Sequence, residues 1–477
     1  MPAQRLDKQA ALLSPLDPAA ADPYYRQIYQ RIRSAIAAGV LKPGDRIPSA
    51  RALMTELGLA RGTVEAAYSL LAAEGYTQAR GQAGTVVTPE LKPRDALASA
   101  PPQAAPPEAR PSFRPDTTLP FQMGLPALDA FPRKIWARLG ARCARSMQPA
   151  DMAHPSIYGL PALRAEIAAY LHVSRGVSCA PSQVFVTAGY RHSIGLIGRA
   201  LLQEGDRVWL ENPGYPPTRE MLVHMGIESV ALPVDAEGMR VSEGIRVAPR
   251  ARAAVVTPAH QSPMGVSLSL PRRLALLDWA ARQKAWIIED DYDGEYRYVS
   301  RPLPALKSLD RDGRVLYAGT FSKVLFPGLR LAYLVVPEAL VERFEQISQV
   351  FAAGSPQLPQ AIVTAFIAEG HFARHIQRMR KLYAQRREDT AAALASILGK
   401  HVQLESQAGG MHLILQLKGR RSDRKLVARM REDGLYAEAL SDWMTDDASA
   451  SALLLGFTNV DSPRTAERLA KRILSLL

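Results

Sequence analysis

A stretch dense in proline and alanine divides the chain into two unequal parts. It runs from Pro89 to Pro120 and shows no apolar periodicity. Such a segment buries too little apolar surface to offset the entropy of ordering it, so we expect a semi-extended linker over residues 90–118. The flanking parts then fold separately, as a module over residues 22–89 behind a tail at 1–21, and as a large domain over residues 119–477.

The module before the linker is expected to contain helices and one hairpin. Apolar residues recur at helical spacing over 25–36,. Ser49 is a suitable N-cap for a short helix at 50–57, and a second helix follows Gly58, over about 61–74,. Two strand-like pieces, 76–79 and 85–88, flank a glycine-rich turn. A helix, a helix-turn-helix and a β-wing together predict a winged helix-turn-helix.

In such a module the start of the second helix faces base edges in the major groove. Arg61 suits bidentate contacts to guanine, and Thr63 suits a phosphate or a thymine methyl group. Arginines before that helix and at the wing suit the DNA backbone or the minor groove. The alternative is a small helical adaptor with solvated arginines, and the combination with the wing favours DNA. The expected DNA-binding residues are Ser49, Arg51, Arg61, Thr63, Arg80 and Gly81.

The module resembles the GntR family of bacterial regulators. The matching stretches are RIPSAR at 46–51, LGLARGTV at 57–64, LAAEG at 71–75, and the glycines around the wing. This resemblance implies binding to a double-stranded DNA operator. Gly62 departs from it, because relatives usually carry a polar residue there.

Residues after the linker alternate between strand-like and helix-like stretches. Short β-rich runs separated by helical patterns predict an α/β domain with a mostly parallel, seven-stranded sheet. In such sheets ligands bind beyond the carboxyl ends of the strands. The expected strands are 183–187, 207–211, 229–233, 253–257, 286–290, 315–319 and 331–336.

One expected strand ends in the run Thr320-Phe321-Ser322-Lys323, with Arg330 seven residues after the lysine. A desolvated lysine with a lowered pKa can form a Schiff base with an aldehyde cofactor. Hydroxyl groups and an arginine suit a phosphate. A lysine at a strand end, taken alone, is more often a surface residue.

A second group follows the strand at 286–290. Alternation along that strand places Asp290 and Tyr292 on one side,. An aspartate beside a pyridinium nitrogen keeps the nitrogen protonated, and a nearby tyrosine can reach the ring oxygen. The alternative is a divalent metal site, because four carboxylates occur within 289–293,. No histidine or glycine-loop spacing supports a metal, so we expect none.

A third group lies in two further loops. Residues 187–192 predict a strand-to-helix turn whose amides, near Tyr190 and Arg191, could hold phosphate at a helix N-terminus,. Residues 211–215 place Tyr215 where it could stack on a planar ring. Either feature alone is weak evidence for a cofactor site, since a tyrosine in such a loop is more often part of the core.

Over about 350 residues the large domain resembles the fold-type I pyridoxal-phosphate (PLP) aminotransferases, and the whole chain resembles the MocR/GabR-type regulators. Further matching stretches are 257–265, 301–306 and 370–375. The resemblance implies a small C-terminal α+β part and a head-to-tail homodimer. It also implies that Lys323 forms the internal aldimine and undergoes aldimine exchange.

The other implied cofactor contacts come from the same resemblance. Asp290 would pair with the pyridine nitrogen, and Tyr292 would contact the ring oxygen. Tyr215 would stack on the ring, and Tyr158 would reach the phosphate of the partner subunit. The remaining implied contacts hold the phosphate: Thr320, Arg330 and the amides near Tyr190 and Arg191.

The sequence departs from true aminotransferases at several positions. Residues 158–162 and 190–192 differ from the usual pattern, and Ser262 stands where aminotransferases carry an asparagine under the ring. The strand at 453–458 lacks the arginine that binds a substrate α-carboxylate. We therefore expect sensing rather than turnover, although a slow transamination half-reaction is compatible with the site.

The function that follows is a PLP-bound transcription regulator that senses an amino compound through an external aldimine. Genes of amine, amino-acid or vitamin B6 metabolism are its expected targets. One alternative is an active aminotransferase with an accessory DNA-binding head. Another is a DNA-binding protein whose large domain only dimerises.

The charge pattern and the chain's beginning bear on location and partners. The formal net charge is +13, there are only two cysteines, and no signal peptide or membrane-spanning run is present, so we expect a cytoplasmic protein without membrane contact. Residues 1–90 carry ten basic and eight acidic side chains, whereas 371–432 carry fourteen and five. We therefore consider DNA contact by a basic helix, with a solvated surface as the alternative. The arginines concerned are Arg378, Arg380, Arg386 and Arg387.

Overall fold

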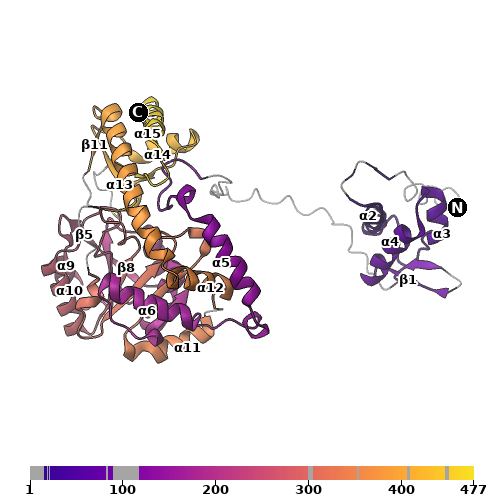
Figure 1. Cartoon of the computed structure of the whole chain (residues 1–477), viewed down its shortest axis with the longest axis horizontal. Helices are drawn as coiled ribbons and strands as arrows, with labels where there is room; N and C mark the ends of the chain where they lie inside the picture. The colour runs from indigo at the N-terminus through magenta and orange to yellow at the C-terminus, as the bar shows by residue number, and fades with distance from the viewer. Residues whose placement is uncertain are drawn as a thin grey trace. The chain divides into compact units, whose positions relative to one another are not determined.

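The chain separates into two compact units, Met1–Arg114 and Pro115–Leu477, and each is described by itself (Figure 1). The computed structural model describes residues 16–18, 20, 22–81, 84–89, 118–298, 304–351, 354–405, 409–445 and 451–477. The expected linker lies outside the described residues except for Thr118. Most of the expected tail, two residues of the wing turn, and the start of the 301–306 stretch also lie outside them.

The first unit has the helices and wing strands expected for a winged helix-turn-helix. Ser49 Oγ accepts a hydrogen bond from Ala52 N at 3.1 Å and so caps the first helix of the motif,. Gly58 ends that helix with φ of 64°, in the left-handed region that glycine adopts without a steric cost,. The elements are α2 (Tyr24–Ala37), α3 (Ala50–Leu57), α4 (Arg61–Ala73), and the antiparallel pair β1 (Thr77–Ala79) and β2 (Thr85–Val87).

The second unit is built on an eight-stranded sheet in the order β3-β10-β9-β8-β7-β4-β5-β6. Its strands are β3 (Val184–Thr187), β4 (Arg207–Asn212), β5 (Glu228–Asp235), β6 (Gly238–Met239), β7 (Ala253–Val256), β8 (Trp286–Asp291), β9 (Val315–Thr320) and β10 (Ala332–Val335).

The fold class expected from the sequence is confirmed, with one correction to the number of strands. The seven expected strands are present, and β6 is an additional two-residue strand. The pairings from β9 through β8, β7 and β4 to β5 are parallel. β10 is antiparallel to both of its neighbours, and β6 is antiparallel to β5. A two-residue strand carries no periodicity that a sequence pattern could reveal.

Helices cover both faces of this sheet because its strands are apolar on both sides. Val208 and Leu210 pack with the core that includes α7 and α11, whereas Trp209 packs on the other side. There Trp209 stacks on Trp279 of α10, with ring centroids 3.8 Å apart. The helices of this part are α5 (Arg133–Ser146), α6 (Pro161–Arg175), α7 (Tyr190–Leu201), α8 (Pro216–His224), α9 (Val241–Val247), α10 (Leu270–Gln283), α11 (Val341–Phe351) and α12 (Gln357–Ala368).

A smaller α+β part completes the second unit, as the resemblance implies. The long helix α13 (His371–Leu398) leads into an antiparallel sheet in the order β11-β12-β14-β13. Its elements are β11 (Val402–Leu404), β12 (His412–Leu417), α14 (Asp423–Glu432), β13 (Glu438–Ala439), β14 (Ala452–Gly456) and α15 (Pro463–Leu476). Within the described part of the chain, no helix has the length and apolar character needed to cross a membrane.

Candidate functional site

Four carboxylates lie within residues 289–293, at and just beyond the carboxyl end of β8, and strand alternation separates the environments of the first three. Glu289 accepts hydrogen bonds from the amides of Leu306 and Lys307 at 2.7 and 2.8 Å. Asp291 lies on the same side and pairs with Arg175 Nε at 2.7 Å. These two acids are therefore committed to structural partners. No group of residues that could hold a metal ion is present among the described residues.

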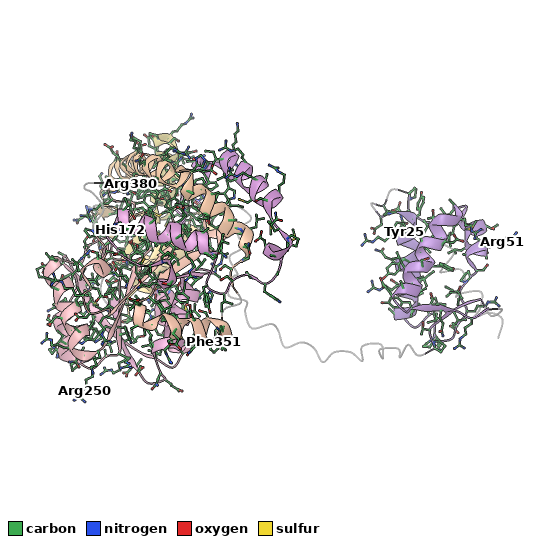
Figure 2. All side chains as sticks on the ribbon, turned by 60° about the horizontal axis from the view of Figure 1, so that its bottom comes forward. Tyr25, Arg51, His172, Arg250, Phe351 and Arg380 are labelled. Carbon is green, nitrogen blue, oxygen red and sulfur yellow. The ribbon has the colours of Figure 1, made fainter. Side chains whose placement is uncertain are left out.

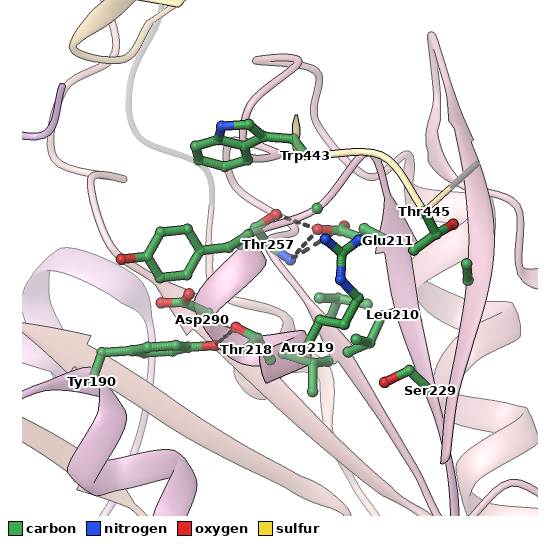
Figure 3. A pocket seen from close by; sticks show the side chains of 15 residues that line it. Tyr190, Leu210, Glu211, Thr218, Arg219, Ser229, Thr257, Asp290, Trp443 and Thr445 are labelled. Atoms are coloured by element: carbon green, nitrogen blue, oxygen red, sulfur yellow. Dashed lines mark hydrogen bonds between the residues drawn. The ribbon is translucent and has the colours of Figure 1, made fainter. Parts of the chain in front are cut away.

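Asp290 points to the opposite side, into a pocket at the ends of β4, β7 and β8 (Figure 3). Its side chain is buried, and no described residue donates a hydrogen bond to its carboxyl group. Burial, reinforced by neighbouring acids such as Asp291 and Glu211, raises the pKa of Asp290 well above its usual range. A cationic N–H placed beside this group would supply both the missing charge and the missing donor.

Lys323 stands three residues beyond the end of β9, with its side chain half-buried. Its Nζ donates a hydrogen bond to the carbonyl oxygen of Gly124 at 2.9 Å. A Cβ atom on Gly124 would lie 2.1 Å from this Nζ, so only glycine permits the approach. Burial lowers the pKa of Lys323, which increases the share of the neutral, nucleophilic amine,.

A place for an anion lies at the N-terminus of α7. Gly189 precedes this helix with φ of 123°, and a Cβ there would lie 3.3 Å from the guanidinium of Arg330. The first amides of a helix lack partners within the helix and attract negative charge. Only the backbone amide of Arg191 would contribute here, because its exposed side chain points to Glu220, at 3.7 Å. Thr320 Oγ1 accepts a hydrogen bond from Ser322 N at 3.1 Å and so orders the loop before Lys323.

Aromatic side chains surround the cavity. Tyr215 precedes α8, and its ring centroid lies 5.8 Å from that of Tyr190 and 5.6 Å from that of Trp443. The hydroxyl group of Tyr190 is 2.8 Å from that of Thr218 (Figure 3). Tyr292 Oη lies 3.0 Å from His260 Nδ1.

Among the expected cofactor contacts, Asp290, Tyr190 and Tyr215 line the pocket. The lining does not include Lys323, Tyr292, Thr320, Arg330 and Arg191, nor does it include Tyr158. The ring of Tyr158 packs edge-on against Phe185 at 5.8 Å, and its hydroxyl group accepts a hydrogen bond from Gln349 Nε2 at 3.4 Å. Its expected contact with a partner subunit stays a prediction.

The sequence analysis did not identify several residues of the site. Glu211 lines the cavity beside Asp290, where Thr257 Oγ1 donates a hydrogen bond to it at 2.5 Å. Burial raises the pKa of Glu211 to about 7. The sequence did contain a signal for Glu211, because this residue stands at the end of an expected strand. No sequence signal pointed to Gly124 or Trp443, because each lies far in the sequence from the other residues of the site.

The residues present fit pyridoxal phosphate. A nucleophilic lysine, a buried carboxyl group without a donor, and a helix N-terminus beside an arginine match its aldehyde, its ring nitrogen and its phosphate. The residues that would hold the cofactor are Lys323, Asp290, Tyr292, Tyr215, Thr320, Arg330 and the amides of Tyr190 and Arg191.

The expected DNA contacts lie on the first unit. Arg51 of α3 is exposed and projects outward (Figure 2), and Arg80 and Gly81 are exposed where β1 ends. Arg61 begins α4, and its Nε is paired with Glu65 Oε1 at 2.6 Å. Thr63 lies on the first turn of α4, half-buried. The Oγ of Ser49 caps α3.

Comparisons with known proteins find a matching family for each of the two units. Residues 24–87 match the bacterial regulatory proteins of the gntR family, and residues 129–445 match aminotransferase class I and II. The probable rhizopine catabolism regulatory protein MocR of Rhizobium meliloti is 37% identical, over 94% of this chain and 93% of its own. The pyridoxine biosynthesis transcriptional regulator PdxR of Corynebacterium glutamicum is 33% identical, over 91% and 92%.

Among solved structures, the α-aminoadipate aminotransferase LysN from Thermus thermophilus is similar to the second unit. It was solved with N-(5'-phosphopyridoxyl)-L-leucine. It superposes with a TM-score of 0.66 at 29% identity, covering 75% of this chain and 93% of that chain.

Proposed function

The chain belongs to the MocR-type regulators, in which a GntR domain precedes a PLP-dependent aminotransferase-like domain, and we propose from this premise that its large domain senses a small amino compound. The first unit binds DNA, and the second reports to it whether the amino compound is present. Genes of amine, amino-acid or vitamin B6 metabolism are the proposed targets. Because it acts on DNA, we place the protein in the cytoplasm.

The observation that carries this proposal is a set of residues suited to the cofactor together with a substrate site that lacks its usual arginine. Asp290 and Tyr190, at the N-terminus of α7, line one pocket, and Lys323 is close enough to Asp290 for their charges to interact. β14, where aminotransferases carry an arginine for the substrate carboxylate, is apolar and buried throughout Ala452–Gly456. Cofactor binding without an anchor for an α-amino acid favours sensing over transamination.

Each residue has a defined part in that sensing. Pyridoxal phosphate, when bound, supplies an aldehyde carbon at which one amine can replace another. Asp290 would balance a positive charge at the ring nitrogen, and Arg330 with the amides of α7 would anchor the phosphate. Lys323 would hold the aldehyde, and the Gly124 carbonyl, which accepts a hydrogen bond from its Nζ, would be a partner for this amine when it is not bound to the cofactor.

The effector can change operator binding only through contacts that differ between two arrangements of the protein. We propose that the protein is a homodimer. Its two arrangements would then differ in how the two DNA-binding heads meet the DNA. In a head-to-tail dimer Tyr158 would contact the partner subunit's cofactor.

Two reciprocal variants test the proposal on an operator selected from random DNA by the full-length protein. Lys323→Ala should remove the visible absorbance of the bound cofactor and abolish any effect of amines on operator affinity. Arg61→Ala should keep that absorbance and weaken the operator complex by about 1–3 kcal/mol, the usual value of a base contact. Retention of the absorbance in Lys323→Ala would contradict the assignment of the lysine.

A second candidate is a working aminotransferase with an accessory head. It is favoured by the 2-aminoadipate transaminase of Thermus thermophilus, which is 29% identical over 75% of this chain and 91% of its own. Single-turnover conversion of the cofactor with a panel of amino acids distinguishes the two. Fast turnover with a keto-acid acceptor would support the enzyme and contradict a pure sensor.

A further inference from the structure

Part of the lining of the pocket beside Asp290 has no role in the proposed cofactor contacts. Asp290, Tyr190 and Tyr215 are the lining residues that the cofactor would use. The lining also includes the side chains of Arg219, on α8, and Ser229, on β5. The pocket therefore presents a cation and a hydroxyl group for which the cofactor supplies no partner.

Arg219 is the only cation among the described residues that line this pocket. Its half-buried side chain extends from α8 into the pocket (Figure 3). Among the described residues it forms no ion pair, and its one hydrogen bond runs from Nη1 to the carbonyl oxygen of Met444 at 3.2 Å. A guanidinium has five N–H donors, so most of them remain for a ligand.

The acids near Arg219 do not neutralise its charge. Glu211 already accepts hydrogen bonds from two neighbouring side chains, and burial raises its pKa to about 7, so it is only partly ionised at neutral pH,. Asp290 serves the ring nitrogen in the proposed function. Glu220, the next residue along α8, pairs with Arg191 at 3.7 Å. A carboxylate brought by a ligand would be the partner that the arginine lacks.

Ser229 supplies a second, independent observation in the same pocket. Its Oγ atom is buried and has no hydrogen-bond partner among the residues that the structure describes. A buried hydroxyl group without a partner is costly, so it marks a place where a polar ligand atom would be stabilised. A hydroxyl group donates to a carboxylate and a guanidinium pairs with one, so both residues suit the same chemical group.

The arginine is also connected to the small α+β part of the second unit. Backbone groups of residues 443–445 form three successive hydrogen bonds, with Gly214 N at 3.1 Å, Arg219 Nη1 at 3.2 Å and Asn212 Oδ1 at 3.1 Å. An anion bound to Arg219 would therefore lie beside the contact between the loop before α8 and this segment. Such a ligand could favour one arrangement of the small part over another.

We propose, on the basis of the proposed function, that the effector is a primary amine that carries a carboxylate, and that Arg219 binds this carboxylate together with the hydroxyl group of Ser229. β14, where aminotransferases carry their arginine, is apolar and buried. The anchor for the carboxylate would thus come from a different element, α8. Pairing in a partly buried pocket is less screened by water than pairing at the surface, so it can dominate the choice of ligand.

Matched pairs of amines test this proposal by titration of the full-length, PLP-loaded protein, followed by its visible absorbance. Each pair joins an amino carboxylate to the amino alcohol of the same chain length: L-alanine with L-alaninol, 3-aminopropanoate with 3-amino-1-propanol, 4-aminobutanoate with 4-amino-1-butanol, and 5-aminopentanoate with 5-amino-1-pentanol. In the pair that binds most tightly, the carboxylate should bind at least about tenfold more tightly than the alcohol.

Arg219→Gln tests the arginine itself. It removes the charge, so the preference for the carboxylate over the alcohol should fall by about tenfold while the cofactor absorbance remains. Arg250→Gln, at an exposed position outside the lining of the pocket, is the control and should leave the preference unchanged. A preference that survives Arg219→Gln would overturn the assignment of the arginine.

Ser229→Ala tests the same subsite by a smaller change, which removes a single hydroxyl group. It should weaken binding of the best carboxylate about fivefold, the usual value of one hydrogen bond. This variant keeps the subsite testable if Arg219→Gln fails to fold. An unchanged affinity would overturn the assignment of Ser229.

The outcomes separate this inference from the proposed function. Binding of the alcohol as tightly as the carboxylate in every pair would overturn the inference and leave amine sensing intact. Absorbance that responds to none of these amines would contradict the proposed sensing itself.

Discussion

At the scale of single residues, the site depends on groups whose ordinary chemistry burial has changed. Burial raises the pKa values of Glu211 and Asp290 and lowers that of Lys323, and each shift favours the neutral form,. A cofactor with a cationic ring nitrogen and an anionic phosphate restores charge to these surroundings.

Glu211 gives the first prediction. Its pKa of about 7 lies above the ordinary value of a glutamate. The folded protein thus holds this proton more tightly than the unfolded chain does. The stability that results is complete below the ordinary pKa and is lost as the pH rises through 7.

Glu211→Gln removes this dependence because an amide does not ionise. Between pH 5 and pH 8 the wild type should lose about 2 kcal/mol of unfolding free energy relative to the variant. Thermal unfolding at both pH values measures the difference. Glu432→Gln, at an exposed position of α14, should follow the wild type, and equal pH profiles for wild type and Glu211→Gln would contradict the prediction.

Gly124 gives the second prediction. Alanine there would place Cβ 2.1 Å from Lys323 Nζ and would strain the backbone, since φ is 69°. Gly313→Ala is a matched control, because its φ is 64° and the nearest atom to its Cβ would be Pro337 Cβ, at 3.9 Å. Gly124→Ala should weaken cofactor binding about tenfold or more, and the control should not. Equal effects in both variants would show that backbone strain alone is responsible.

At the scale of elements, helix α13 shows how charge can serve packing. The Arg386 guanidinium forms an ion pair with Asp129 at 2.5 Å, and Arg380 Nε donates a hydrogen bond to the Glu295 carbonyl at 2.6 Å. Arg378 donates one to the Ala130 carbonyl. These contacts tie α13 to the segment before α5 and to the loop after β8. They favour a structural role over the DNA contact considered from composition.

The third prediction therefore concerns stability. Arg386→Met should lower the unfolding free energy of the second unit by about 2 kcal/mol, because it removes charge-assisted hydrogen bonds from a buried side chain,. The salt dependence of operator binding should stay unchanged. Arg468→Met, at an exposed position of the adjacent α15, serves as the control. A flatter salt dependence in Arg386→Met would restore the DNA hypothesis.

At the scale of the whole molecule, the chain consists of two units with separate cores. A ligand of one unit should therefore stabilise that unit alone. Calorimetry should resolve two unfolding transitions, and removal of pyridoxal phosphate should lower only that of the second unit. The loss is about 4 kcal/mol when the cofactor had been present at roughly a thousand times its dissociation constant. A shift of both transitions would show that the units unfold together.

The amino-acid sequence by itself determined the two-part organisation, the winged helix-turn-helix, the seven principal strands, and the placing of Lys323 and Asp290 at strand ends. Each of these follows from periodicity, from glycine and proline positions, or from a short motif, and such signals act between residues close in the chain. Tertiary structure alone decided which distant segments complete the site. Gly124 meets Lys323 across 199 residues, and Trp443 joins the lining of the pocket only after the small sheet has packed. No local pattern encodes such pairs, because they depend on how whole elements fit together.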